Sequence, residues 1–452
     1  MTAVIVFSIV CFLLFTGKIL RVFVPLFQRL YLPSSVVGGL AGLLCFSLFG
    51  KYLPPEWHAG LSKMPGFLIN VVFAALFLGA VTPKLKEVFS IAFPQLCFGQ
   101  LFAWGQYVIG LALAGFLLSP VFGLPPAFGN LLEIGFEGGH GTVGGMVQTF
   151  TDFNWREGAD LGFTVATAGM IIGIVAGMAM VNWALNKNII GNVRTFSERD
   201  RAERIGIYGD EEAKPAAGKQ TVFCDSIDSL AWHIVLVGIA IIIGFGILKA
   251  LQYLEILLLP DVKTRLFKGF PLFPLCMIGG IIVQLLMQSV RVNQLVDHGQ
   301  MQRISGAALD FLVVSAVATI KLSVVVQNWL PLLILITCGT VWGIVLVVFV
   351  APKIFKDAWF ERAIADFGQS MGVTATGLML LRTVDPESKT AAAASFGYKQ
   401  LFHEPVMGGG LWTALALTLV FTVGWLPVWI ISVVFFLLWT VAALIMARKN
   451  RR

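Results

Sequence analysis

The sequence contains few charged residues. Only 13% of the 452 residues are Asp, Glu, Lys or Arg, whereas 57% are hydrophobic. A soluble protein of this length needs roughly a quarter of its residues charged. The shortage excludes a water-facing surface over most of the molecule and indicates that most of it faces lipid.

Motifs of several enzyme and pump classes are also missing. The sequence has no Walker A string to hold nucleotide phosphates, no Gly-x-Ser-x-Gly elbow and no His-Glu-x-x-His pair. The six cysteines show no Cys-x-x-Cys or metal-like spacing, so we interpret them as small hydrophobic residues. We therefore predict a protein that is not an enzyme, is not a primary pump and needs no cofactor.

Long apolar runs recur along the whole chain. A helix needs roughly 20 residues to cross about 30 Å of hydrocarbon. The first run has no basic segment before it and no cleavage site after it, so we interpret it as a helix rather than a signal peptide. The sequence predicts an all-α polytopic membrane protein with helices at about 2–17, 33–50, 66–83, 90–119, 160–186, 230–250, 270–290, 305–322, 328–351, 389–424 and 427–446.

An internal duplication is indicated by stretches that correspond in order, all at spacings of about 230–240 residues. They are 33–42 with 274–283, 63–85 with 303–322, and 138–145 with 368–377. We predict a first repeat at 1–186, a polar cytosolic linker at 187–229, a second repeat at 230–424, and an additional transmembrane helix with a basic cytosolic tail at 425–452.

The positive charges predict the orientation. With the N-terminus outside, cytosolic segments hold 20 Lys and Arg and external segments hold 7, and the ratio is still 13 to 7 without the linker. Five crossings in the first half invert the second half relative to the first. The predicted fold is thus two inverted-topology five-helix repeats and a cytosolic C-terminus.

Two glycine-rich segments, 126–150 and 358–382, do not fit a continuous span. Such backbone breaks a helix and frees amides, which a membrane tolerates only where protein or water surrounds them. We predict a re-entrant hairpin in each segment, with the broken tips meeting near the midplane. The alternative is close packing of helices through small residues.

The broken tips predict a solute site. Half-helix N-termini can hold a carboxylate, and freed carbonyls and hydroxyls suit a sodium ion. The candidate substrate-binding residues are Glu137, Gly139, His140, Gly141, Thr142, Gln369, Ser370, Gly372, Thr374 and Thr376. Two alternatives remain open: Glu137 could be a water-exposed vestibule residue, and His140 could serve only to bond the helix break.

Ionisable residues inside membrane segments are a second functional signal. Asp310 lies inside the run at 305–322, and Asn70 occupies the corresponding position in the first half. Together with Asp366, they are the candidate sodium ligands, and we predict no other metal. Asp310 could instead be a paired structural acid or a proton site, and a cation/proton exchanger that uses Asp310 with no organic substrate is the alternative function.

The string Gly138–Thr142, followed by Ala166–Gly169, resembles the sodium/glutamate symporter family, as does Pro33–Leu40. The resemblance covers roughly 1–424. It implies two five-helix domains with re-entrant hairpins, an extracellular N-terminus, sodium as coupling ion and glutamate as substrate. It also implies an elevator-like movement of a core against a scaffold, in a homodimer of a bacterial inner membrane.

Three features depart from the family pattern: Glu137, the segment 368–372 and the helix at 427–446. A negative charge at Glu137 weakens anion binding unless the carboxyl is paired or protonated. The sequence thus predicts sodium-coupled symport of glutamate or a similar small amino or carboxylic acid, with the lipid bilayer and sodium as partners and no nucleic acid.

Overall fold

The computed structural model describes residues 2–30, 32–80, 85–190, 201–208, 214, 216–260, 267, 270–385 and 389–451. Over this part of the chain the protein is all helical and contains no strand. Eight of the described helices are long and apolar enough to cross a membrane, which confirms a multi-pass membrane protein. Much of the predicted linker, including 191–200 and 209–213, lies outside the described residues.

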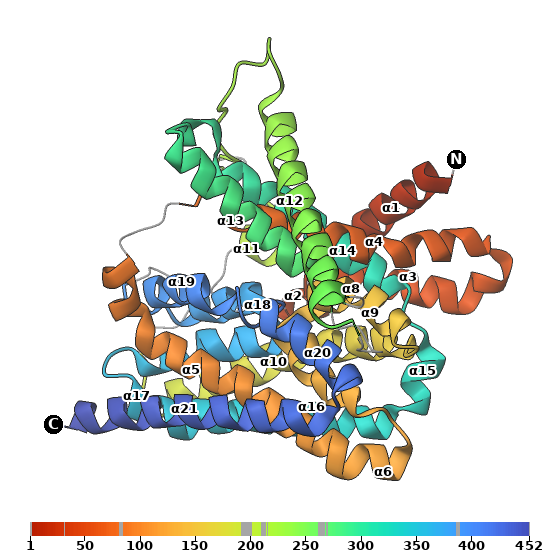
Figure 1. Ribbon diagram of the computed structural model, residues 1–452. Coiled ribbons are helices and arrows are strands. Elements are labelled where there is room, and N and C mark those ends of the chain that lie inside the picture. Colours follow the sequence, from red (N-terminus) through yellow and green to blue (C-terminus); the bar gives the residue numbers. More distant parts are fainter. Residues whose placement is uncertain are drawn as a thin grey trace.

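One group of helices, which we call the scaffold, lies together in the upper part of Figure 1. Its members are α1 (Thr2–Phe23), α3 (Ser34–Phe49), α4 (Pro55–Ala75), α12 (Ser229–Leu258), α13 (Phe273–Ser289) and α14 (His298–Ala318). Two small hydrophobic clusters hold the scaffold together. One joins α1, α4 and α14, and the other joins α4, α12, α13 and α14.

The two Gly-Gly pairs of the scaffold allow helices to approach closely. A β-carbon at Gly38 would press on the backbone of α1 at Leu13, and one at Gly39 would press on α14. In the second half, Gly279 faces α12 and Gly280 faces α4 in the same way. Each pair thus contacts the first helix of its own half and the third helix of the other half. This arrangement agrees with a duplication, although the inverted repeats themselves stay a prediction.

The second group, which we call the core, occupies the lower part of Figure 1. It surrounds most of a large apolar cluster, which also extends into the scaffold helices α3, α4, α13 and α14. The members of the core are α5 (Leu85–Ala112), α7 (Leu131–Phe136), α8 (Gly139–Gly145), α9 (Val147–Asp152), α10 (Glu157–Asn186), α16 (Trp329–Val345), α18 (Trp359–Val384), α19 (Ala392–His403) and α20 (Leu411–Thr422). Short helices complete the fold: α2 (Pro25–Arg29), α6 (Ser119–Phe122), α11 (Arg201–Ile205), α15 (Leu322–Gln327) and α17 (Ala351–Ile354).

A further helix, α21 (Trp425–Arg451), is present where 427–446 was predicted and lies along α5 (Figure 1). The rings of Trp104 and Phe435 stack with centroids 4.7 Å apart, and Trp429 Nε1 donates to the carbonyl of Val108 at 3.1 Å. These contacts attach α21 to the core rather than to the scaffold.

The prediction of one continuous helix at 389–424 is wrong. The chain forms α19 and α20 instead, separated by residues 404–410. Pro405 has no backbone N–H to continue the helix, and Gly408 and Gly409 have φ values of +64° and +107°. A run that is apolar on average therefore contains a third helix break.

Core and scaffold meet along α8, whose glycines face the scaffold helices. A β-carbon at Gly141 would lie 2.8 Å from Ile69 Cδ1, and one at Gly144 would lie 2.7 Å from Pro65 Cβ, both in α4. Because this face of α8 carries no side chains, it presents a smooth surface to α4.

Candidate functional site

The two predicted broken segments meet inside the core. The first breaks between α7 and α8, where Gly139 has a φ of +64°. The second is a kink within α18 at Gly372 and Val373, and Val373 itself has a φ of +64°. A β-carbon at Gly139 would collide with Cγ1 of Val373, so the two breaks touch. Whether each segment is a re-entrant hairpin stays a prediction.

The third break, between α19 and α20, packs against the first. A β-carbon at Gly408 would lie 3.4 Å from Glu137 Cγ, and one at Gly409 would lie 2.5 Å from Thr142 Oγ1. The hydroxyl of Thr142 also donates to the carbonyl of Gly408 at 3.4 Å. Three interruptions of helical backbone thus converge on one place in the core, which concentrates freed amides and carbonyls there.

A buried polar network surrounds this place, and Glu133 of α7 is its most fully bonded member. Its carboxylate accepts hydrogen bonds from Tyr107 Oη at 2.7 Å, Thr413 Oγ1 at 2.8 Å and the backbone N–H of Gly408 at 2.9 Å. Three donors stabilise an ionised carboxylate even in a fully buried position.

Glu137 bonds His403 at the end of α19, through Oε1 and Nε2, and both side chains are buried. On the other side of the ring, Gln100 Nε2 lies 3.1 Å from His403 Nδ1. The amide orientation of Gln100 is set by Trp104, whose Nε1 donates to Gln100 Oε1 at 2.8 Å. Glu137, His403 and Gln100 thus form a chain of hydrogen bonds that links α7, α19 and α5.

A fully buried ion pair forms the other half of the network. Lys399 Nζ of α19 donates to Asp366 Oδ1 of α18 at 2.8 Å and to Gln369 Oε1 at 2.8 Å. Asp366 Oδ2 accepts from Gln95 Nε2 of α5, also at 2.8 Å. Both carboxylate oxygens of Asp366 therefore have protein partners, and the ammonium group of Lys399 already neutralises the charge that would attract a sodium ion. The role of Asp366 as a sodium ligand stays a prediction.

The remaining polar residues of the α18 segment lie close to its kink. Thr376 Oγ1 donates to the carbonyl of Gly372, and Thr374 Oγ1 donates to Glu404 Oε1 at 2.9 Å. Ser370 is buried, and its carbonyl accepts from Gln106 Nε2 at 2.7 Å. Gln369 bonds Lys399, as described above. The structure thus gathers the predicted substrate residues of α18 into the network or beside the kink.

The predicted substrate-binding residues of α8 are buried, but His140 does not bond any member of the polar network. His140 Nε2 lies 2.9 Å from Thr167 Oγ1 in α10. That hydroxyl donates its proton to the carbonyl of Phe163 at 2.8 Å, so His140 Nε2 must carry the proton and donate. His140 therefore bonds α8 to α10, and Gly141 lies at the scaffold boundary.

Asn70 and Asp310 lie in the scaffold, apart from the network. Asn70 Nδ2 donates to the carbonyl of Gly66 at 2.8 Å, and its Oδ1 lies 3.7 Å from Cys276 Sγ. Asp310 accepts a hydrogen bond from the side chain of Ser35. Each residue thus bonds a helix from the other half of the chain, and their assignment as sodium ligands stays a prediction.

No group of His, Cys, Asp and Glu side chains in the described part of the chain is arranged to hold a metal ion. The three helix breaks instead offer backbone carbonyls and hydroxyls, which are oxygen donors of the kind that can bind sodium.

Sequence reasoning missed several members of the network: Gln95, Gln100, Tyr107, Lys399, His403 and Glu404. The sequence does contain a signal for Lys399, His403 and Glu404. Lys399 and His403 are four residues apart, hence on one face of a helix, and both precede three consecutive glycines at 408–410. Polar groups followed by glycine are the same pattern that identified the other two breaks.

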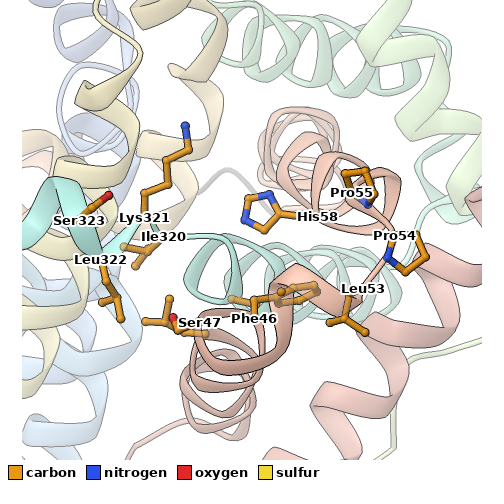
Figure 2. Close-up of a pocket in the computed structure, with 13 residues that line it drawn as sticks. Phe46, Ser47, Leu53, Pro54, Pro55, His58, Ile320, Lys321, Leu322 and Ser323 are labelled. Atoms are coloured by element: carbon orange, nitrogen blue, oxygen red, sulfur yellow. The ribbon is translucent and has the colours of Figure 1, made fainter.

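A pocket of about 390 Å³ lies elsewhere, at the junction of α3, α4 and the loop after α14. Figure 2 shows Ile320–Ser323 on one side and, across from them, Leu53, Pro54, Pro55 and His58. None of its lining residues belongs to the polar network.

Comparison with known families gives one match. The model of the family described as sodium/glutamate symporter matches residues 1–387. No curated protein matches the sequence significantly. The match includes α7, α8 and α18 but ends before α19, so Lys399, His403 and Glu404 lie beyond it.

Proposed function

Because the chain belongs to the sodium/glutamate symporter family, we propose that it performs sodium-coupled symport of glutamate or a similar small amino or carboxylic acid. The family is one of transporters, not of enzymes. The observation that supports the proposal most directly is the contact between the break at Gly139 and the kink at Val373, inside a core that borders a separate scaffold.

The proposed solute site lies at these breaks. Amides around Gly139–Thr142 and Gly372–Thr376 receive the carboxylate of the solute, and carbonyls freed at the same breaks bind sodium. If ion and solute share this small region, each raises the affinity for the other by the same factor. Gly139–Thr142, Gly372 and Thr376 are buried, whereas Thr374 is half-buried and Ala375 is exposed, so the proposed site borders the protein surface at the kink of α18.

The proposed movement is elevator-like, with the core sliding against the scaffold. The smooth face of α8 supports it, because Gly141 and Gly144 present no side chains that would interlock with α4. The scaffold would form the homodimer contact. The N-terminus would lie outside and the C-terminus in the cytosol, a proposal supported by the distribution of Lys and Arg. We propose a bacterial inner membrane as the location.

The test is uptake of radiolabelled glutamate into proteoliposomes with an inward sodium gradient, compared with potassium in place of sodium and with protein-free vesicles. We expect accumulation only with protein and sodium. Competition by other amino and dicarboxylic acids then defines the substrate range. If no small acid is accumulated or competes in vesicles that contain folded protein, the proposal is wrong.

A further inference from the structure

Glu137 has one carboxylate oxygen with a partner and one without. Its side chain is buried, with the residue only 3% exposed. Oε1 bonds His403, whereas no described residue donates a hydrogen bond to Oε2. An unpaired oxygen of an ionised carboxylate at this depth would be strongly unfavourable.

His403 does not supply a compensating positive charge. The Nε1–H of Trp104 can only donate, so Gln100 presents its oxygen to Trp104 and its amino group to His403. An amino group can only donate, so His403 Nδ1 must accept and carries no proton. The imidazole is therefore the neutral form with its proton on Nε2, directed at Glu137 Oε1.

The other charged neighbours of Glu137 add negative charge rather than remove it. Glu133 in α7 and Glu404 after α19 both lie close enough to repel it. Lys399 is the nearest cation, but it is already bonded to Asp366 of α18.

The remaining titratable groups next to Glu137 do not change the net charge around it. Tyr107 of α5 donates a hydrogen bond to Glu133, and His140 of α8 donates a hydrogen bond to Thr167 of α10. An ionised Glu137 would thus be a second negative charge beside Glu133, and no cation among the described residues is bonded to it.

We propose that Glu137 is a proton-binding site and that one proton moves with each solute through the transporter. This inference rests on the proposed function above. A proton on Oε2 removes the charge from the carboxylate oxygen that has no hydrogen-bond donor among the described residues. The cycle balances as one proton bound to the Glu137 carboxylate on one side of the membrane and released from it on the other.

The same site explains how an acid can lie beside the proposed binding site of an anion. A bound carboxylate disfavours ionisation of Glu137, so solute binding and proton binding strengthen each other. Reciprocal linkage of this kind moves solute and proton in the same direction. Glutamate would therefore be accompanied by sodium and by a proton.

The experiment uses proteoliposomes with an entrapped pH-sensitive dye, an inward sodium gradient and a clamped membrane potential. Addition of glutamate should acidify the lumen in step with uptake of the label. In Glu137→Gln, which retains the shape of the protonated side chain, the acidification measured per labelled glutamate taken up should fall to zero. The control is Glu361→Gln, which changes an acid of α18 that lies outside the network. Vesicles with this variant should acidify as much as vesicles with the parent protein.

Glutamate accumulation without acidification, protons moving opposite to glutamate, or equal acidification by Glu137→Gln would each overturn the inference and leave the proposed function intact. If neither glutamate nor another small acid is accumulated, the proposed function fails, and infrared spectroscopy of purified protein tests the proton site alone. The C=O band of a protonated carboxyl should be present and should disappear in Glu137→Gln; absence of a difference between the two proteins overturns the inference. His403→Gln provides a second variant if Glu137→Gln does not fold.

Discussion

Glycine has a different role in the scaffold and in the core. In the scaffold, Gly38, Gly39, Gly279 and Gly280 lie inside unbroken helices and only allow neighbouring backbones to approach. In the core, Gly139, Gly372 and the glycines at 408–410 interrupt helices, and each interruption has acids or hydroxyls beside it. Glycine alone therefore does not mark a site in a membrane protein, whereas glycine next to buried polar groups does.

The core and the scaffold should differ most in the stability that is lost when a charged side chain is removed, because the charge in the core is buried. Lys399→Met leaves Asp366 ionised and unpaired, and we expect a loss of about 3–5 kcal/mol in stability. Lys249→Met, in the scaffold helix α12, removes an exposed amine that bonds Gln252 and lies 5.4 Å from the centroid of the Phe245 ring, and should cost less than about 1 kcal/mol. Thermal unfolding in detergent measures both.

A double variant controls for the loss of side-chain packing in this comparison. Lys399→Met with Asp366→Asn removes both charges of the pair and should recover most of the lost stability. If Lys399→Met unfolds at the same temperature as the parent protein, the buried pair does not hold α18 and α19 together.

The contact between two helix breaks can be tested at Gly139. Gly139→Ala places a side chain at a φ of +64° and against Val373. Strain of about 1–3 kcal/mol should lower glutamate uptake by roughly tenfold to a hundredfold. Gly246→Ala in α12, where a β-carbon meets no other atom, should leave uptake unchanged.

Val373→Ala removes the methyl groups that Gly139→Ala would strike. We expect the double variant to recover part of the uptake, since the overlap is relieved and the unfavourable φ remains. Identical uptake in the single and double variants would argue that the two breaks do not touch during transport.

A smaller effect is expected at the boundary between core and scaffold. Gly144→Ala adds a methyl group 2.7 Å from Pro65 Cβ on the otherwise smooth face of α8. It should slow uptake by about tenfold, because overpacking of this kind costs about 1–3 kcal/mol. Equilibrium binding of glutamate should change much less. Gly238→Ala in α12 is the matched control, and a loss of binding in Gly144→Ala equal to the loss of rate would contradict a sliding boundary.

The smallest effect should lie at the edge of the scaffold, where Asp297 caps α14 and holds the end of the linker. Asp297 Oδ1 accepts from the backbone N–H of Gln300 at 2.9 Å and of Lys219 at 3.0 Å. Burial by itself would raise the pKa of Asp297, but these hydrogen bonds outweigh it and lower the pKa from its usual value.

Because the pKa of Asp297 is lower in the folded protein, its stabilising contribution is present at neutral pH. It is lost as the pH falls below about 4. Asp297→Ala should cost about 0.5–2 kcal/mol locally and expose the Lys219 amide to hydrogen exchange at neutral pH. Unchanged exchange at Lys219 would show that Asp297 does not hold the linker.

The spans and the first two breaks could be predicted because they depend on local composition. Runs of apolar residues and the polar glycine-rich segments at 126–150 and 358–382 are visible without knowledge of their neighbours. The third break was missed because average hydropathy across 389–424 hides seven interrupting residues at 404–410 between two apolar helices.

The pairings inside the core could not be predicted, because they depend on which distant segments meet. Glu137 and His403 are 266 positions apart, and Gln95 and Asp366 are 271 apart. Asp366 was interpreted as a sodium ligand because sequence shows an acid in a membrane segment but not the lysine that neutralises it. Only packing of α19 between α5 and α18 brings that lysine into contact.

The family match ends at residue 387, between the two sides of both buried pairs. Asp366 and Glu137 lie inside the matched region, whereas Lys399 and His403 lie beyond it. The segment after residue 387 therefore supplies the buried partners of two acids that precede it. A chimera that joins residues 1–387 of this chain to the C-terminal segment of a relative should thus be stable only when that segment supplies a hydrogen-bond partner for Asp366 and for Glu137.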